Sequence, residues 1–598
     1  MMSLCLGNHG NVWGKLSDNR SWLLNIAMIA VFCDINTVHV APVQSLLDIH
    51  AASYVSFTSE HCVTKMARFL NLRASAVKYM LTDCRGFTTA SDGAGTLQQR
   101  WAPAGRPGRA LAVPMVGERV MHGFPAPAPV DPDTNSEGAT AHTADYVAST
   151  SFSDLSPVVL RRCKRMILDT LGVTVVGSTT EVAGMVAAYS LAQQGVRPEP
   201  AGSCALLGRK DRSTSAPLAA FANGVSAHSM DFDDTWHPAT HPSAPVLASL
   251  LALTDLLRPV STVSGRELLQ AFAVGIEVQG RLLRTSAQAK NIPWRFHPPA
   301  VVGVMGSAAA CAKLLQHDPT RVRNALSAAA SYAGAPMANA GTTAKPLHAG
   351  NAARFGLEAA LLASVGMKGN PHILDMRSGF GAFFDDFVPE TLQDFNGGHL
   401  LDKQDVAIKR FPAHLGTHWA SDAAAEVRGK LARHDGTVDT DRIRQVVVHA
   451  PKCGYVNRPI PKCEHEARHS FQFNVCTTLL DGTVSRQSFG PNLLHRPELR
   501  SLLRRTDIRH PPDNVKCFET MYVDVEVRLR DGTVVTSRCT EPYGHWRRPL
   551  RQDDVVAKFR DNAETALPSS VVQECVDKVE NLENMRDCSE LTDMLSRP

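Results

Sequence analysis

Apolar residues recur at helical spacing along most of the chain beyond residue 146. The first such segment places five of them on one helical face: Leu160, Cys163, Ile167, Leu168 and Leu171. Ser156 is a typical N-cap residue, and Pro157 suits the first helical position. Gly172 predicts the end of this helix.

The same period continues in seven further segments. They predict helices at 215–229, 243–257, 265–287, 301–315, 319–333, 349–366 and 421–433. Alanine and glycine dominate several of these helices, as in 303–312. Because small residues let helix axes approach closely, we expect these helices to be buried in a bundle.

The pattern changes after about residue 401. Residues 444–449 are rich in β-branched residues, and Asp481-Gly482 and Asp531-Gly532 are typical of hairpin turns. Segments 523–530 and 533–538 alternate well enough to predict two paired strands around the second turn. From residue 543 a helical pattern resumes and continues to residue 595.

These patterns predict a mainly α-helical, discontinuous bundle domain with an inserted, smaller α+β domain. We place the helical domain at 141–406 plus 542–598, and the insertion at 407–541. Residues 1–140 show no sustained periodicity, and 85–137 are rich in Gly, Pro and Arg, as linkers are. We therefore expect a poorly ordered N-terminal extension, for which a targeting segment and an inaccurate gene start both stay open.

Composition excludes several classes of partner. The 62 basic and 58 acidic residues leave a net charge of +4, which gives no electrostatic case for nucleic acid. The apolar run at 22–33 is shorter than the roughly 20 residues that span a bilayer, so we expect no membrane insertion. The fourteen cysteines include no Cys-x-x-Cys pair, so neither a common metal motif nor a disulfide framework is expected.

The stretch 227–243 concentrates groups that could do chemistry. It contains three aspartates, two threonines, a tryptophan and three histidines between two Ala/Leu-rich segments. Such groups in apolar surroundings must be paired, solvated or used, which makes the stretch a candidate site. His237 and His241 suggest a metal, but Pro238 between them argues against one helical face presenting both, so we expect no metal. Some of these residues could instead cap the helix that starts near Ser243.

Other candidates lie at the edges of buried segments. His297 precedes a long apolar helix, Lys345 lies in a small-residue turn, and Lys409 and His414 lie where the helical domain meets the insertion. Each alone is more often structural than functional. No Gly-rich phosphate loop, dinucleotide fingerprint or nucleophile elbow occurs, which argues against nucleotide cofactors and serine hydrolases. A cofactor-free acid–base enzyme using His and Lys remains.

Several long segments together resemble the MmgE/PrpD family, from about Leu155 to the C-terminus. The resemblance is carried by 228–241, 295–299, 345–348, 409–414, 455–459, 464–471 and 543–547. Within the family, they are most like the animal members that convert cis-aconitate into itaconate and CO2. The resemblance implies a carboxy-lyase that acts on this tricarboxylate, with 2-methylcitrate dehydration or a catalytically silent scaffold as alternatives.

The resemblance also implies an architecture and a location. It implies a homodimer with a large helical domain, a smaller lid domain and neither a metal nor an organic cofactor. The animal relatives suggest a mitochondrial protein with a part in innate immunity, and a cytoplasmic location is the alternative. The family's pocket residues correspond to Asp231, Thr235, His241, His297, Lys345, Lys409, His414 and Tyr455.

For the reaction so implied, the residue types suggest roles. Lys345 and Lys409 would bind carboxylates and stabilise charge. His297 is the first choice for the proton donor, with His241 or His414 as alternatives. The remaining three would assist: Asp231 by orienting a histidine and raising its pKa, and Thr235 and Tyr455 by positioning hydrogen bonds.

Overall fold

The computed structural model describes residues 138–598, apart from 195–201, 211, 237–239, 287–292, 294, 394, 396 and 597–598. The expectations for the N-terminal extension up to residue 137, including the apolar run at 22–33, lie outside the described residues. So does His237. The first described helix starts at Ala139, earlier in the chain than residue 146, where the apolar pattern indicated the start of helical structure.

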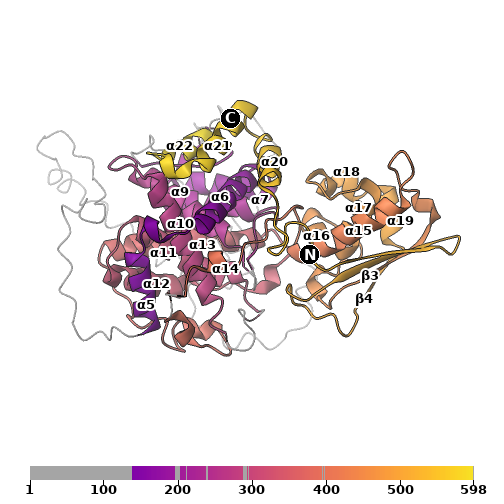
Figure 1. Cartoon of the computed structure of the whole chain (residues 1–598). Helices are drawn as coiled ribbons and strands as arrows, with labels where there is room; N and C mark the ends of the chain where they lie inside the picture. Colours follow the sequence, from indigo (N-terminus) through magenta and orange to yellow (C-terminus); the bar gives the residue numbers. More distant parts are fainter. Residues whose placement is uncertain are drawn as a thin grey trace, which may run out of the picture. The chain divides into compact units, whose positions relative to one another are not determined.

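One hydrophobic core is built from helices of both the first and the last part of the described chain (Figure 1). Its long helices are α5 (Ala139–Ser149), α6 (Pro157–Gly177), α7 (Glu181–Gln194), α8 (Ala216–His228), α9 (Ser243–Leu257), α10 (Gly265–Leu282), α11 (Pro298–Leu314), α12 (Pro319–Tyr332), α13 (Lys345–Ser364), α20 (Gln552–Ala563), α21 (Ser569–Glu580) and α22 (Ser589–Leu595). A short α14 (Leu400–Lys403) and a two-stranded pair, β1 (Cys204–Ala205) with β2 (Ser213–Thr214), complete this part. The C-terminal helices α20 and α21 pack against α6, so distant segments share one core.

The helix α6 illustrates how far periodicity predicts an element. Ser156 caps it as expected, because its side chain accepts a hydrogen bond from the Val159 backbone N–H. The predicted end at Gly172 is wrong, since α6 continues to Gly177. Gly172 serves packing instead: a Cβ there would lie 2.9 Å from Phe559 Cδ2 of α20. Three other helices begin three or four residues earlier in the structure than the sequence predicted. One of them is α13, so Lys345 is its first residue and does not lie in a turn.

A second hydrophobic cluster contains buried residues from 407 to 539. Its four-stranded sheet has the order β4-β3-β5-β6, with β3 (Ile443–His449), β4 (Thr506–Arg509), β5 (Val523–Leu529) and β6 (Val534–Cys539). β3 and β4 are parallel and the other pairs are antiparallel. The helices are α15 (His418–Leu431), α16 (Glu464–Arg468), α17 (Phe471–Asp481), α18 (Pro491–Leu494) and α19 (Pro497–Leu503), and α15 packs on β5 and β6.

The two Asp-Gly pairs have different roles in this part of the chain. The hairpin at Asp531-Gly532 is confirmed, because it joins the antiparallel strands β5 and β6. The hairpin predicted at Asp481-Gly482 is wrong. Gly482 has φ 85° and ends α17, its N–H bonding the Thr478 carbonyl. Both glycines have a positive φ, which hairpin turns and helix ends alike require. The Asp-Gly dipeptide alone therefore could not distinguish a turn from a helix end.

The described residues contain no single helix with the length and apolar composition needed to cross a membrane. The helices α6 and α7 meet at an angle of 86°, and only when taken together are they long and apolar enough by those two criteria.

Helices α8 and α13 cross at two glycines near the ends that carry polar residues. A Cβ on Gly224 would lie 2.9 Å from Gly350 Cα, and a Cβ on Gly350 would lie 2.6 Å from the Phe221 carbonyl oxygen. The crossing lies about one turn from the last residue of α8, His228, and from the first of α13, Lys345. Backbone contact at this point therefore fixes the positions of His228 and Lys345 relative to each other.

We predict that Gly350→Ala destabilises the protein, because the added methyl group would meet both the Phe221 carbonyl oxygen, at 2.6 Å, and the branched side chain of Val225, at 2.5 Å. Overpacking of this kind costs about 1–3 kcal/mol. The matched control is Gly429→Ala in α15, where a Cβ would have no neighbour within 4 Å. That change should stabilise by about 0.5–1 kcal/mol through helix propensity. Chemical denaturation measures the unfolding free energy of both variants. Equal changes in the two variants would contradict the close contact of α8 and α13 at Gly350.

Candidate active site

The loop between α8 and α9 places Asp231 at the centre of a buried cluster. Asp231 is 3% exposed and has φ 50°, a left-handed conformation that aspartate tolerates better than most residues. The turn begins at the last residue of α8, His228, and directs the Asp231 carboxylate inward. A residue strained in this way and surrounded by charge is typical of a functional site.

Asp231 contacts two lysines and a histidine from three other parts of the chain. Lys345 Nζ lies 2.6 Å from Oδ2. Lys409 donates to Oδ1 and, over 2.8 Å, to the Asp231 carbonyl oxygen. His469 Nε2 lies 3.1 Å from Oδ2. Burial opposes ionisation of this carboxyl, but the two lysines and then His469 outweigh burial and hold its pKa well below the usual range.

A second buried carboxylate, Asp233, holds two histidines. His228 Nδ1 donates to Asp233 Oδ2 over 2.8 Å, and His241 Nδ1 lies 3.2 Å from the same oxygen. Burial opposes the charge of Asp233, and the histidines favour it, so its pKa lies well below the usual range. Burial lowers the pKa of His228 to about 4 despite Asp233, which makes this ring neutral near pH 7.

His297 lies beside these rings, and its Nδ1 is 3.1 Å from His348 Nδ1. It is the N-cap residue of α11, and its backbone N–H donates to the Ala335 carbonyl over 2.9 Å. One of the two facing Nδ1 atoms must carry the shared hydrogen. Burial first, and then the Lys345 charge, hold the pKa of His297 well below its usual value.

His414 and Tyr455 form a hydrogen-bonded pair next to the Asp231 cluster. The Gly416 backbone N–H donates to His414 Nδ1 over 3.2 Å, so His414 Nε2 carries the hydrogen and donates to the Tyr455 oxygen. Burial raises the pKa of Tyr455 well above 10, which keeps the phenol protonated. The phenol hydrogen is then free to bond another group. The His414 and His469 ring centroids are 5.8 Å apart, which links the pair to Asp231.

Two neighbours of Asp231 in the same loop have different roles. Thr235 exchanges two backbone hydrogen bonds with Ala407, and its buried hydroxyl has no hydrogen-bond partner among the described residues. Asp234 accepts hydrogen bonds from the Ser243 backbone and hydroxyl at the start of α9. This confirms the capping interpretation for one residue of the stretch. Burial raises the pKa of Asp234 to about 8.

Two buried cations hold the polar loops from outside the cluster. Arg468 donates to the carbonyl of Met230 over 3.2 Å and to that of Pro412 over 2.5 Å, so it ties together the segments that carry Asp231 and Lys409. Lys558 of α20 donates to the Phe232 carbonyl over 2.9 Å and pairs with Asp169 of α6 over 2.7 Å.

The predicted residues therefore fall into one region. Asp231, Lys345, Lys409 and His241 are in direct or near contact, with His241 Nε2 3.9 Å from Asp231 Oδ1. Sequence reasoning assigned no individual role to five further residues: His228, Asp233, His348, Arg468 and His469. All five lie within segments quoted for the family resemblance, and His228 and Asp233 also lie in the candidate stretch 227–243, but no spacing showed which groups they contact.

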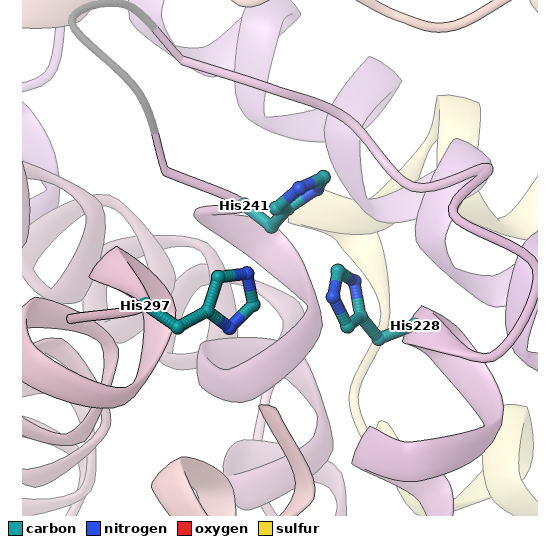
Figure 2. A group of neighbouring side chains, drawn as sticks. All are labelled: His228, His241 and His297. Atoms are coloured by element: carbon teal, nitrogen blue, oxygen red, sulfur yellow. The ribbon is translucent and has the colours of Figure 1, made fainter. Parts of the chain in front are cut away.

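Two groups of three side chains have the composition of metal ligands. Each of His228, His241 and His297 offers one ring nitrogen within 4.8 Å of the others (Figure 2). Asp231 and Asp233 with His241 form the second group. The second group fits a cation poorly, because Lys345 and Lys409 already occupy both oxygens of Asp231.

Comparison with known families accounts for most of the described chain. Residues 141–390 match the MmgE/PrpD N-terminal domain, and residues 411–584 match the MmgE/PrpD C-terminal domain. The chain belongs to the MmgE/PrpD family. The resemblance predicted from the sequence segments is confirmed, and every residue of the Asp231 cluster except Lys409 lies in one of the two matched regions.

Within the family, the chain is similar to proteins named cis-aconitate decarboxylase. A protein of Mus musculus named cis-aconitate decarboxylase is 48% identical over 464 residues, which are 77% of this chain and 94% of the relative. Its namesake in Homo sapiens is 49% identical over 445 residues, 74% of this chain and 92% of the relative. A cis-aconitate decarboxylase-like protein of Aspergillus oryzae is 26% identical over 491 residues, 78% and 98% of the two chains.

We predict that Asp231→Asn destabilises the protein strongly, because it leaves Lys345 and Lys409 buried without a counter-charge. Breaking a buried pair in this way costs about 3–5 kcal/mol. The control is Asp385→Asn, whose side chain is 70% exposed and pairs with Arg295 on the surface. It should cost less than about 1 kcal/mol.

Urea denaturation at several pH values measures this difference. The folded pKa of Asp231 is depressed, so its contribution is fully present above the unfolded pKa of about 4 and is lost as the pH falls further. The difference in unfolding free energy between the natural protein and Asp231→Asn should therefore become smaller as the pH falls below about 4. A small difference in unfolding free energy at pH 7 would contradict the pairing of Asp231 with the two lysines.

Proposed function

We propose that this chain is a cis-aconitate decarboxylase, which converts cis-aconitate into itaconate and CO2 with its own side chains as acid–base groups. The observation that carries the proposal is a single carboxylate, Asp231, with two buried lysines on it and two histidines beside it, His469 and His241, whose pKa values burial lowers. Such a site suits a small polyanion. The names of the Mus musculus and Homo sapiens relatives support this substrate over others.

Substrate capture requires donors that the lysines can provide. Cis-aconitate carries three carboxylates, and each ammonium group has three N–H donors. Lys409 directs donors to Asp231 Oδ1 and to the Asp231 carbonyl, and Lys345 directs one to Oδ2. Further donors remain for substrate carboxylates. Asp231 thus stabilises two cations in a buried place and holds them where an anion will bind.

The chemical step shifts two electron pairs and adds one proton. The bond between the CH2 carbon and its carboxylate breaks, and CO2 leaves. The electron pair forms a new double bond, and the former double bond moves its electrons to the far carbon, beside another carboxylate. That carbon takes a proton, so each turnover consumes one. Lys345 and Lys409 stabilise negative charge on the remaining carboxylates as it develops.

His297 is the residue that we assign as proton donor. Burial and the Lys345 charge keep it neutral without substrate, but the negative charge of a bound tricarboxylate opposes that effect and raises its pKa. His348 Nδ1 can accept the Nδ1 hydrogen of a protonated His297, which leaves Nε2–H for the substrate carbon. His241 and His414 are the alternative donors. Asp233 orients His241, and the His414 pair leaves the Tyr455 hydroxyl free to position a carboxylate. We assign the unpaired Thr235 hydroxyl the same positioning role.

The domain arrangement is part of the same proposal. Two separate hydrophobic clusters, one including residues on both sides of 407–541, support a discontinuous helical domain of 141–406 plus 542–598 with an inserted domain of 407–541. The inserted part brings Lys409, His414, Tyr455 and His469 to the site, as a lid would. A homodimer, a mitochondrial location and a part in innate immunity stay predictions from the family resemblance.

Proton NMR of the purified full chain with cis-aconitate tests the proposed activity. We expect the vinyl protons of itaconate to appear without added metal or cofactor. His297→Ala should reduce the rate by about 10²–10⁴-fold, the usual contribution of a general acid. His317→Ala is the control, because His317 is also buried but bonds Ser364 away from the cluster. If cis-aconitate persisted while 2-methylcitrate lost water, the chain would be a dehydratase. Turnover of neither would indicate a silent scaffold.

A further inference from the structure

Three buried histidines face one another from three separate segments. His228 ends α8, His241 lies in the loop before α9, and His297 precedes α11. Figure 2 shows their rings around a common space. One nitrogen of each ring lies within 4.8 Å of the others, and each residue is at most 9% exposed. Sequence spacing gives no sign of this group, because His228 and His297 are far apart in the chain.

Each of the three rings has a partner that fixes its orientation from behind. Asp233 Oδ2 accepts from His228 Nδ1 over 2.8 Å and lies 3.2 Å from His241 Nδ1. Because a carboxylate only accepts, both Nδ1 atoms carry hydrogen, and each neutral ring keeps the lone pair of Nε2. His348 Nδ1 lies 3.1 Å from His297 Nδ1 and holds the third ring.

One atom of the group lacks any hydrogen-bond partner. His228 Nε2 is fully buried, and none of the described residues donates to it or accepts from it. A buried ring nitrogen without a partner costs free energy unless something binds it. This observation is independent of the spacing of the three rings.

We propose that His228, His241 and His297 bind a divalent transition-metal ion of the zinc type, and that this ion inhibits the enzyme. Zinc accepts three histidine nitrogens at about 2.0–2.1 Å and takes water or an anion as fourth ligand, so nitrogens that already lie within 4.8 Å of one another need only a small shift of the rings to reach it. Zinc-bound histidines typically donate their other N–H to a carboxylate, which is the role of Asp233 here.

The ion is an inhibitor and not a cofactor because it takes the groups that the reaction needs. Coordination uses the lone pairs of His241 and His297, so neither could carry a proton to the substrate carbon. A bound ion also occupies the space between these rings. This part of the inference rests on the proposed function, whereas binding of the ion does not.

Titration of the metal-free full chain with Co²⁺ tests the binding. We expect one ion per chain, with the intense visible absorption of a four-coordinate site, and displacement by Zn²⁺. Asp233→Asn should weaken binding by about 10–100-fold, as the loss of such a carboxylate partner typically does. His228→Asn should weaken it at least as much. His317→Asn is the matched control, because it changes a buried histidine outside the group.

Circular dichroism shows whether Asp233→Asn and His228→Asn fold. If one of them does not fold, Co²⁺ binding by the other tests the site. Failure to bind Co²⁺, or equal binding by the natural chain and both folded variants, would overturn the site. Inhibition is tested separately by adding Zn²⁺ to the turnover assay and then removing it with a chelator. Stoichiometric binding without inhibition would overturn the inhibitory role. A metal-free chain that binds Co²⁺ but turns over no cis-aconitate would contradict the proposed function alone.

Discussion

The balance of charge around Asp231 is the interaction on which the site depends. Two ammonium groups, from Lys345 and Lys409, are buried at side-chain exposures of 7% and 0%, and one carboxylate compensates them. A buried cation without a partner costs several kcal/mol. The carboxylate must therefore be placed accurately, and its left-handed backbone conformation is the local cost of that placement. Lysines held in this way are ready for an anionic substrate without rearrangement of the surrounding helices.

The rest of the structure supports that placement through contacts between distant segments. The glycine crossing of α8 and α13 brings the loop that carries Asp231 next to Lys345. Arg468 bonds the carbonyls on both sides of the site, and Lys558 bonds the Phe232 carbonyl from α20. These groups are neither substrate ligands nor acids in the proposed reaction, but they fix the backbone from which those side chains project.

The sequence predicted the helices and strands well because their apolar periods are strong, and it failed where one residue type serves two purposes. Gly172 packs a helix pair, and Gly482 ends a helix instead of a hairpin. Spacing and residue type, with the family resemblance, predicted all three residues of the Asp231–Lys345–Lys409 group. They could not predict that Asp233 would serve two histidines or that His348 would meet His297, since those contacts depend on how α8, α11 and α13 cross.

A double-mutant cycle on Asp231 and Lys409 tests the charge balance most directly. The unfolding free energies of the natural chain, Asp231→Asn, Lys409→Met and the double variant are measured under one set of conditions. Asp231→Asn leaves both lysines without a counter-charge, whereas Lys409→Met leaves Asp231 paired with Lys345 alone. In the double variant Lys345 is the one member of the group that keeps a charge. We predict a coupling free energy above about 1 kcal/mol, within the range found for contacting residues. Additive effects, with a coupling near zero, would contradict the account.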